Sequence, residues 1–408
     1  MTESVSLAPR PVPPRRLSWL RSELDDWTAQ GLITEGQAAR ISTRYRPERH
    51  ARPLLGGLLL RVGGAFVGTG LVWLVAANLD RLAPLTRFGL VAALWLFFLV
   101  GGEVLAHRRA SPSVVGAARL LAALGLGAMV FQAAQSLQVP AFEPRLVGLW
   151  AAGALLHGYL TGAFAPFAVG VVTGVGWWLT QPLWDEQSGL TAVVLLGAGA
   201  VLAAALAVVH DGRADRFARA WRTVAAGMAL LAGFVAAIPD IGSDGIVWST
   251  SLVLALAVAA AAAALAAVTR PGARILEPVG AIGVLLGAGV LALWTTGSDA
   301  SDVGTADWLR AAVAVAAYAA LAVGLVALGA LRDHPALTWM ATTALVVFTT
   351  FQSFAVFAPI VTGAWLFVVL GTVFLGTGFL FDRARRGLAQ ALDVPPTPSS
   401  PGTPTDAS

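Results

Sequence analysis

The sequence contains no cysteine and no lysine, and it has few charged residues of any kind. Charged residues make up 12% of the 408 residues, about half the share of a soluble globular domain, whereas hydrophobic residues make up 57%. The absence of cysteine excludes disulfide bonds and thiol chemistry. The high apolar content excludes an intrinsically disordered chain. Because only a lipid bilayer accepts this much apolar surface, the sequence predicts an integral membrane protein.

Motifs for common chemistries are also missing. The sequence has no phosphate-binding loop, no zinc-ligand spacing and no serine nucleophile elbow. It shows no paired carboxylates or histidines at one membrane interface, so an enzyme is not favoured, and no catalytic residue, cofactor or metal site is predicted. The net charge of +4 suggests no nucleic-acid partner, since no folded soluble module presents a basic face.

Long apolar runs recur along the chain, and a helix needs about 20 apolar residues to cross a bilayer. Two runs, residues 146–184 and 335–381, are long enough for two helices each and are broken near a proline. The sequence therefore predicts an all-α, polytopic transmembrane helical bundle of about twelve spans. The single-span runs are residues 62–79, 88–102, 120–142, 191–209, 223–239, 245–269, 278–298 and 311–331.

The arginines indicate how these spans are oriented. With the N-terminus inside, 22 of the 27 arginines fall on one side of the membrane. Only Arg81, Arg87, Arg145 and Arg310 fall on the other side, where most of the loop acids lie. Short cytoplasmic loops carry such an excess of basic residues. We therefore expect a multi-pass protein of the bacterial cytoplasmic (inner) membrane, with both termini in the cytoplasm and the lipid bilayer as its surroundings.

Composition divides the chain into four segments. The two ends are rich in proline, with arginine at the N-terminus and with serine and threonine at the C-terminus, which is typical of disorder. The expected organisation is a disordered tail over residues 1–16, a cytoplasmic helical hairpin over 17–52, a transmembrane domain over 53–382 and a disordered cytoplasmic tail over 383–408.

The hairpin has recognisable helix signals. Leu24 and Trp27 lie on one apolar helical face, and Thr34 followed by Gln37 is the pattern of a capping box at the start of a second helix. A hairpin of this size is too small to fold strongly alone. We therefore expect residues 17–46 to dock on the membrane domain, on a cytoplasmic protein partner or on another copy of the chain.

The first third of the chain resembles a known family. The resemblance is carried by the hairpin pattern in residues 24–35, by the glycines of residues 63–70 and by the Ala-Ala-Asn-Leu-Asp corner at residues 76–80. Over roughly residues 17–140 the sequence is similar to bacterial predicted membrane proteins known as domain of unknown function 2157. The resemblance implies a polytopic inner-membrane protein, and it implies no activity.

Polar residues inside membrane spans are candidate functional residues. Arg61 and Glu103 lie near the cytoplasmic ends of the first two spans, where adjacent antiparallel helices would pair them, with Arg119 nearby. Such a pair would serve as a gate or ion path, or as a structural pair that reaches to the interface.

A second candidate lies at the opposite membrane face. Asn78 and Asp80 end the first span, and Gln132 and Gln135 end the third. Together they would form a polar vestibule that binds a solute, or they would hydrogen-bond helix ends and the connecting loop.

Two further features are candidates for lining a pathway. His157 lies well inside a span, where no carboxylate is expected nearby, so a hydrogen bond to a neighbouring helix is favoured over a proton relay. Thr342, Thr349 and Ser353 share one helix face and would line a pathway or bond to their own helix carbonyls.

Pairs of glycines four residues apart are frequent, among them Gly158/Gly162, Gly170/Gly174 and Gly283/Gly287. Such pairs favour close helix packing and do not by themselves indicate a ligand site.

The function that fits this pattern is transport of a small solute by an integral membrane protein. The alternative is a membrane scaffold or signalling protein that docks a partner through its N-terminal hairpin. An envelope enzyme is the weakest reading, for want of catalytic groups.

Overall fold

The computed structural model describes most of the chain between residues 10 and 357. The described residues are 10–12, 14–47, 63, 66, 70, 83–137, 140, 143–184, 187–270, 272–296, 304–357, 368, 371–372, 375–376 and 383. Arg61, Asn78, Asp80 and most of the two apolar runs at residues 62–79 and 361–381 lie outside this set. The chain divides into two compact units, residues 1–71 and 72–408.

The first unit contains two helices and a short strand pair. Its elements are β1 (Arg10–Val12), α1 (Pro14–Ala29), α2 (Glu35–Thr43) and β2 (Tyr45–Pro47), with β1 parallel to β2. The predicted capping box is confirmed, because the Thr34 side chain accepts from the Gln37 backbone N–H and the Gln37 side chain accepts from the Thr34 backbone N–H at 2.8 Å. Gly31, with φ +71°, makes the left-handed turn between the helices.

Residues that composition assigns to the N-terminal tail contain structure in this unit. Residues 10–16 include β1 and the first residues of α1. Leu17 and Leu24 are buried, whereas Trp19 is 61% exposed and Leu32 is 67% exposed. The unit therefore buries a small apolar face and leaves other large apolar side chains uncovered.

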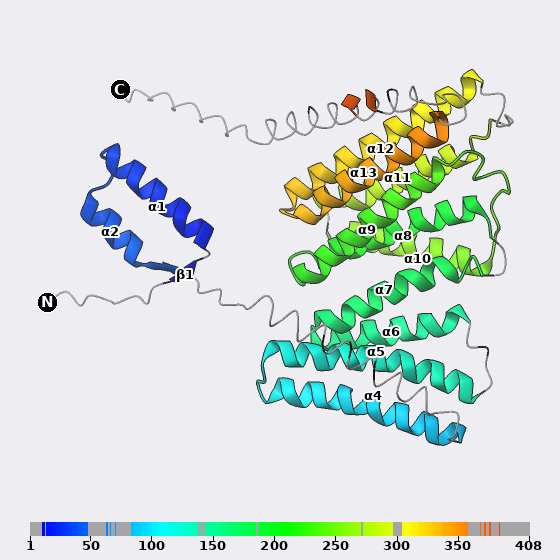
Figure 1. The fold of residues 1–408 in the computed structure, drawn as a ribbon, viewed down its shortest axis with the longest axis horizontal. Helices are drawn as coiled ribbons and strands as arrows, with labels where there is room; N and C mark the ends of the chain where they lie inside the picture. The colour runs from blue at the N-terminus through cyan, green and yellow to red at the C-terminus, as the bar shows by residue number, and fades with distance from the viewer. Residues whose placement is uncertain are drawn as a thin grey trace, which may run out of the picture. The chain divides into compact units, whose positions relative to one another are not determined.

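The second unit is built from long helices that run roughly parallel and antiparallel to one another (Figure 1). Proline occupies the first turn of α4, α5 and α6, where its missing N–H costs nothing, and serine caps α5, α8 and α10. The helices are α4 (Pro84–His107), α5 (Pro112–Ser136), α6 (Pro144–Thr161), α7 (Phe164–Thr180), α8 (Gly189–His210), α9 (Asp215–Ala236), α10 (Thr250–Thr269), α11 (Leu276–Leu293), α12 (Thr305–Leu331) and α13 (Pro335–Phe357).

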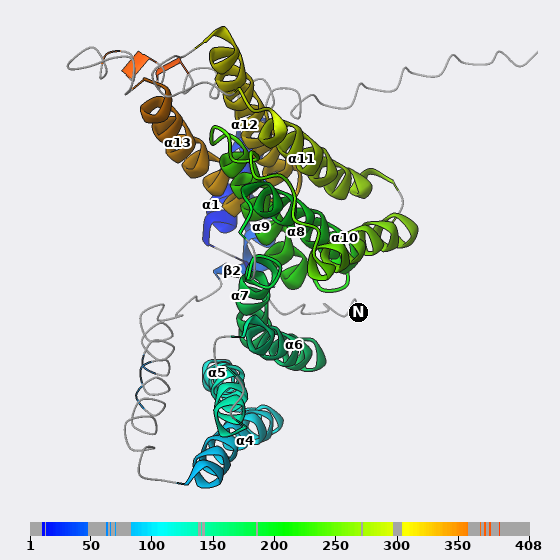
Figure 2. The same cartoon turned by 90° about the vertical axis from the view of Figure 1, so that its right-hand side faces the viewer.

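Helix α8 forms the core of this unit. Fifteen of its 22 residues are buried, and it packs against α9, α10 and α11. The other helices form hairpins, α4 with α5, α6 with α7 and α12 with α13. In Figure 2 the pair α4 and α5 is strongly foreshortened, and α12 and α13 are seen obliquely. The predicted break within the apolar run of residues 146–184 is confirmed, since Gly162 at φ +61° turns the chain between α6 and α7, shortly before Pro166.

The all-helical membrane class is confirmed, but twelve spans is an overestimate. Among the described residues, six helices are long and apolar enough to cross a membrane, namely α4, α5, α8, α10, α11 and α12. The sequence count relied on apolar runs, whereas a span also needs a helix of sufficient length and low charge. Helix α7 has 17 residues, and α9 carries three arginines in its first half.

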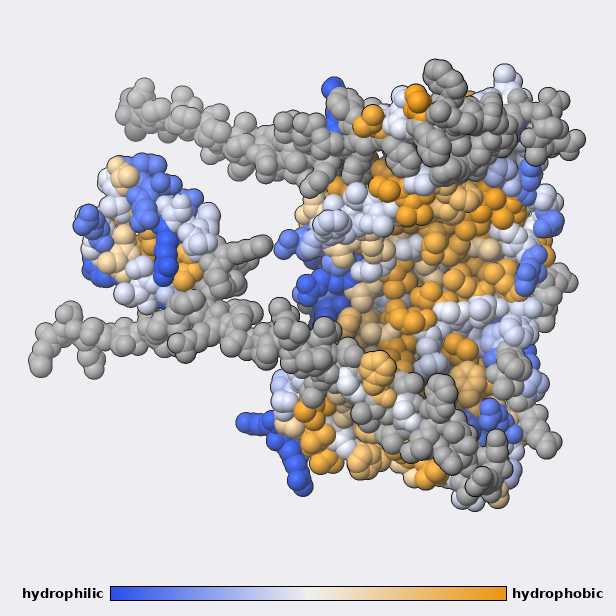
Figure 3. Space-filling view, viewed as in Figure 1, coloured by the Kyte–Doolittle hydropathy of each residue, from blue (hydrophilic) through white to orange (hydrophobic). Residues whose placement is uncertain are grey.

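The surface of the helices agrees with a membrane setting. Figure 3 shows a broad hydrophobic band on the face in view, with hydrophilic residues gathered toward the two ends of the helices. Large apolar side chains such as Leu96, Leu254 and Leu286 are exposed on α4, α10 and α11. This membrane-helix character fits a lipid bilayer, in which such side chains contact acyl chains.

Candidate functional site

Charged residues from five segments meet at one end of the second unit. We call this the basic end, because the chain connections there are rich in arginine. It is where α8, α10 and α12 finish and where α9, α11 and α13 begin. The side chains that meet there, which we call the ion cluster, are Asp211, Arg222, Arg274, Glu277 and Arg332.

The geometry of the ion cluster is well defined. Arg222 bridges both carboxylates, with its Nε 2.9 Å from Glu277 Oε2 and its Nη2 3.1 Å from Asp211 Oδ1. Arg332 also bridges them, with Nη2 2.5 Å from Glu277 Oε1 and Nη1 3.3 Å from Asp211 Oδ2. Arg274 Nε lies 3.4 Å from Asp211 Oδ2. The cluster thus ties the starts of α9 and α11 to the ends of α8 and α12.

Burial differs sharply within the cluster. The side chains of Arg222 and Glu277 are each 5% exposed, whereas those of Arg332 and Arg274 are 23% and 42% exposed. Three guanidinium groups share two carboxylates, which leaves an excess of one positive charge. Loss of one partner from such a buried ion pair leaves an uncompensated charge and is strongly destabilising, so the pairs between Arg222, Asp211 and Glu277 hold these helix ends together.

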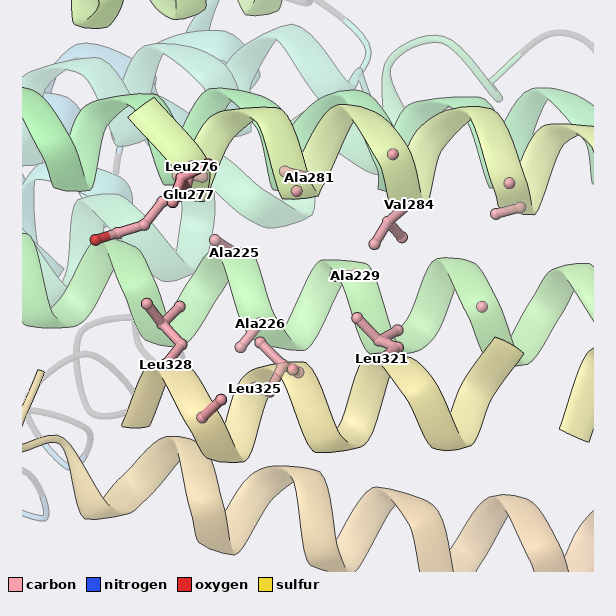
Figure 4. Close-up of a pocket in the computed structure, with 18 of the residues that line it drawn as sticks. Ala225, Ala226, Ala229, Leu276, Glu277, Ala281, Val284, Leu321, Leu325 and Leu328 are labelled. Atoms are coloured by element: carbon pink, nitrogen blue, oxygen red, sulfur yellow. The ribbon is translucent and has the colours of Figure 1, made fainter. Parts of the chain in front are cut away.

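A cavity of about 850 Å³ extends from the ion cluster into the unit between α9, α11 and α12. Its charged end is formed by four cluster residues, and Figure 4 shows the Glu277 carboxylate at that end, with Val284 and Leu321 on opposite walls farther along. The remaining lining is alanine, glycine, leucine and valine, with Tyr318 as the one aromatic residue. The cavity therefore has a long apolar body and one cationic end.

Glycines keep this cavity open on the side of α11. A Cβ atom added at Gly280, Gly283 or Gly287 would meet no described atom within 4 Å, and the same holds for Gly324 on α12. The prediction of close helix packing at Gly283 and Gly287 is therefore wrong among the described residues. The expectation is confirmed at Gly158, where a Cβ would lie 2.6 Å from the backbone nitrogen of Phe167.

This site was not predicted from the sequence. The three arginines were interpreted only as signals of orientation, and Glu277 was not a candidate residue. A usable signal was present, because Glu277 is the one acidic residue between residues 245 and 298. A lone carboxylate in apolar sequence needs a basic partner.

A second polar group joins α4, α5 and α6. Arg119 donates to both carboxylate oxygens of Glu103, at 2.8 and 2.6 Å, and His157 Nε2 lies 3.4 Å from Glu103 Oε1. The expectation that His157 has no carboxylate neighbour is therefore wrong. The partner lies 54 residues away in the sequence, and the helix hairpins bring the two together. Because Arg61 is outside the described residues, its pairing with Glu103 stays a prediction.

The predicted vestibule is described only in part, because Asn78 and Asp80 lie outside the described residues. At the end of α5, Gln132 contacts Ser136 at 3.5 Å, and Ser136 lies 3.4 Å from the Pro84 carbonyl oxygen at the start of α4. Gln135 is exposed. The described polar contacts thus connect two helix ends.

The hydroxyl groups on α13 bond within their own helix. Thr342 donates to the Thr338 carbonyl at 2.8 Å, and Thr349, which is 3% exposed, donates to the Leu345 carbonyl. The Ser353 side chain lies outside the described set. Neither Thr342 nor Thr349 lines the cavity.

No group of three or more histidine, aspartate or glutamate side chains among the described residues has an arrangement that would hold a metal ion. Around the cavity, the groups available for binding are guanidinium and carboxylate side chains together with apolar walls.

These features define an all-helical membrane protein with several apolar helices. Residues 25–167 match the family described as Predicted membrane protein (DUF2157), so the resemblance expected from the sequence is confirmed over this segment. No curated protein and no solved structure matches the chain. The matched segment contains Glu103, Arg119 and His157, whereas the ion cluster and the cavity lie beyond its end.

Proposed function

We propose that this membrane protein binds a small amphipathic solute in the cavity between α9, α11 and α12 and transports it. The observation that carries the proposal is the cavity itself, because its apolar body ends on the ion cluster. A volume of about 850 Å³ is within the range of small-molecule sites, which are mostly apolar with a few polar groups that fix orientation.

The side of α11 supplies an entry route from the bilayer. Gly280, Gly283 and Gly287 line the cavity and are themselves exposed. Helices α11 and α12 both line the cavity and make few backbone contacts with each other in the described residues. A solute dissolved in the membrane therefore reaches the cavity without crossing water.

In this proposal the basic end faces the cytoplasm of a bacterial cell, in the inner membrane, and both termini are cytoplasmic. The arginine-rich connections at residues 108–109 and 213–222 support this orientation, because short cytoplasmic loops carry basic residues. The ion cluster then lies at the cytoplasmic interface, where a polar headgroup is hydrated.

The experiment uses the full chain in phosphatidylcholine proteoliposomes with a trace of phosphatidylethanolamine that carries the fluorescent label NBD on its amine, a probe with one negative charge. Dithionite added outside bleaches the label in the outer leaflet. Transfer of the labelled lipid between leaflets then appears as a slow loss of the fluorescence that remains in the inner leaflet. We expect the protein to accelerate this loss. We expect Gly287→Leu to return the rate to that of protein-free liposomes, because the leucine side chain fills the cavity.

Gly289→Leu is the matched control. Gly289 is on the same helix, has equal free space around its Cβ and does not line the cavity. Equal rates for the two variants, or no acceleration by the unmodified protein, would count against transport through this cavity.

A second candidate function is a membrane scaffold or signalling role through the N-terminal unit. Trp19 and Leu32, which are both largely exposed, favour it, since large apolar side chains on so small a unit are available for docking. Deletion of residues 1–50 should release a cytoplasmic partner in a pull-down. An unchanged set of bound proteins would refute docking.

A further inference from the structure

We infer that the solute is an anionic phospholipid, with one acyl chain in the cavity and its phosphate bound by Arg274 and Arg332. The inference rests on the proposed function, because it names the class of molecule that the same cavity takes. Three observations carry it: the charge of the cavity's end, the exposure of these two arginines and the length of the apolar body.

The charge at the end of the cavity favours an anion. Arg222, Arg274 and Arg332 line it, against one lining carboxylate, Glu277. Asp211, which pairs with Arg222 but does not line the cavity, adds a second carboxylate. Arg270 donates to the Asp211 carbonyl oxygen at 2.7 Å. The group therefore carries more positive than negative charge, and an anionic headgroup would balance it.

The two outer arginines are placed to receive a headgroup. Arg222 and Arg332 each bridge both carboxylates, but the side chain of Arg222 is 5% exposed and that of Arg332 is 23% exposed. Arg274 has one ion pair among the described residues, at 3.4 Å, and 42% of its side chain is exposed. A guanidinium group presents planar donors that match phosphate oxygens. Basic pockets between transmembrane helices are a common way of binding anionic lipid headgroups.

The length of the apolar body matches an acyl chain. Along α11 the lining runs from Glu277 to Leu291, which corresponds to about 21 Å at the rise of an α-helix. One leaflet of the hydrocarbon core is about 15 Å thick. The cavity therefore accommodates an acyl chain across a whole leaflet, because the small alanine and glycine residues of its lining leave space for the chain.

The test measures lipid binding to the full-length protein in detergent by native mass spectrometry. The probes are dioleoylphosphatidylglycerol, dioleoylphosphatidylcholine with the same chains, and glycerol 3-phosphate without chains. We expect phosphatidylglycerol to bind most tightly and glycerol 3-phosphate to show no binding. Arg274→Gln should weaken the binding of phosphatidylglycerol about tenfold, as expected for the loss of one charge-assisted contact, and should leave the binding of phosphatidylcholine unchanged.

Arg213→Gln is the charge control, because Arg213 is exposed at the same end and does not line the cavity. It should retain the preference for phosphatidylglycerol. If it lowers binding as much as Arg274→Gln does, the preference reflects surface attraction alone and the inference is overturned. Binding of glycerol 3-phosphate as tight as that of phosphatidylglycerol would also overturn it, in favour of a free anion.

The outcomes separate this inference from the proposed function. If Gly287→Leu weakens the binding of both lipids equally and the unmodified protein has no preference between them, the cavity binds lipid but the anionic class is wrong. If Gly287→Leu changes the binding of neither lipid, both proposals fail.

Two other occupants of the cavity are tested directly. Ala364 belongs to the chain's own apolar run at residues 361–381. A cross-link between Gly287→Cys and Ala364→Cys in the same chain would mean that this run fills the cavity. Dissociation of an oligomer by Gly287→Leu, seen by light scattering, would mean that a second copy fills it. Either result overturns the inference, and absence of both supports it.

Discussion

Single arginines have different roles in this protein according to what surrounds them. Arg222 is buried against two carboxylates, Arg274 is half-exposed at the mouth of a cavity, and Arg145 is 80% exposed at the start of α6. Arg310 is the clearest case of a structural role. From the sequence it is one of four arginines on the outer side, yet it is 4% exposed and lies at the start of α12.

Replacement of Arg310 should destabilise the fold. Its guanidinium donates to the carbonyl oxygens of Trp294 at 2.8 Å, Ile238 at 2.9 Å and Ala237 at 3.2 Å, which end α9 and α11. Lysine has one compact charged group and leaves some of these carbonyls unpaired. We expect Arg310→Lys to lower the free energy of unfolding by about 2–4 kcal/mol.

The measurement is thermal or denaturant unfolding of the purified protein, followed by tryptophan fluorescence. Arg145→Lys is the control and should change stability by less than about 0.5 kcal/mol, because Arg145 is exposed. Similar stability for the two variants would show that the carbonyl contacts of Arg310 contribute little.

His334 should make stability depend on pH. It lies between α12 and α13, is 8% exposed, and its Nδ1 has no hydrogen-bond partner among the described residues. Burial lowers the pKa of His334, and the charges of Arg219 and Arg222 lower it further. Below about pH 6.5 the unfolded chain therefore binds a proton that the folded protein does not, and stability falls as the pH decreases toward the folded pKa.

The check compares the unmodified protein with His334→Gln by thermal unfolding from pH 8 to pH 5, a range that brackets the ordinary histidine pKa of about 6.5. The variant should lose less stability on acidification, since its side chain stays neutral. Parallel curves would assign the acid sensitivity to other groups.

At the scale of helices and their connections, local sequence signals predict boundaries well. Proline at the first turn of α4, α5 and α6 and the serine caps of α5, α8 and α10 act within four residues of chain, so their effect is readable without knowing the fold. The capping box at Thr34 is another case. Which helix faces meet is not readable in this way, as the glycines show.

The same substitution should have opposite effects at two helix glycines. A methyl group at Gly158 collides with the backbone of α7, whereas one at Gly283 enters open space. We expect Gly158→Ala to destabilise the protein by about 1–3 kcal/mol through overpacking. We expect Gly283→Ala to stabilise it by up to about 1 kcal/mol, because alanine has the higher helix propensity.

Unfolding of the two variants under identical conditions tests this contrast. A destabilising Gly283→Ala would mean that another chain segment or molecule packs against α11, and a neutral Gly158→Ala would mean that the α6–α7 pair relaxes without cost.

At the scale of the whole molecule, the orientation in the membrane is testable because the chain has no cysteine. Single cysteines at Arg213 and at Ser243, both exposed, report on the two ends of α9. With the basic end in the cytoplasm, a membrane-impermeant maleimide should label Ser243→Cys in intact bacterial cells. It should label Arg213→Cys only after the membrane is opened. The reverse pattern would invert the proposed orientation and place the ion cluster outside.

The sequence alone determined the class of protein, its all-helical character, the capping box at Thr34 and the family resemblance of the first third. These follow from composition and from interactions between residues within a few positions of one another. It overestimated the number of spans, because apolar composition does not report helix length or the charges at a helix start.

Only the tertiary structure decided which charges meet. Glu103 and His157 are 54 residues apart, and Arg222 and Glu277 are 55 residues apart, yet each pair is in contact. The cavity likewise depends on how three helices pack, and the same glycine pattern closes one helix pair and leaves another open. Contacts between distant residues are set by the packing of whole helices, which no local pattern encodes.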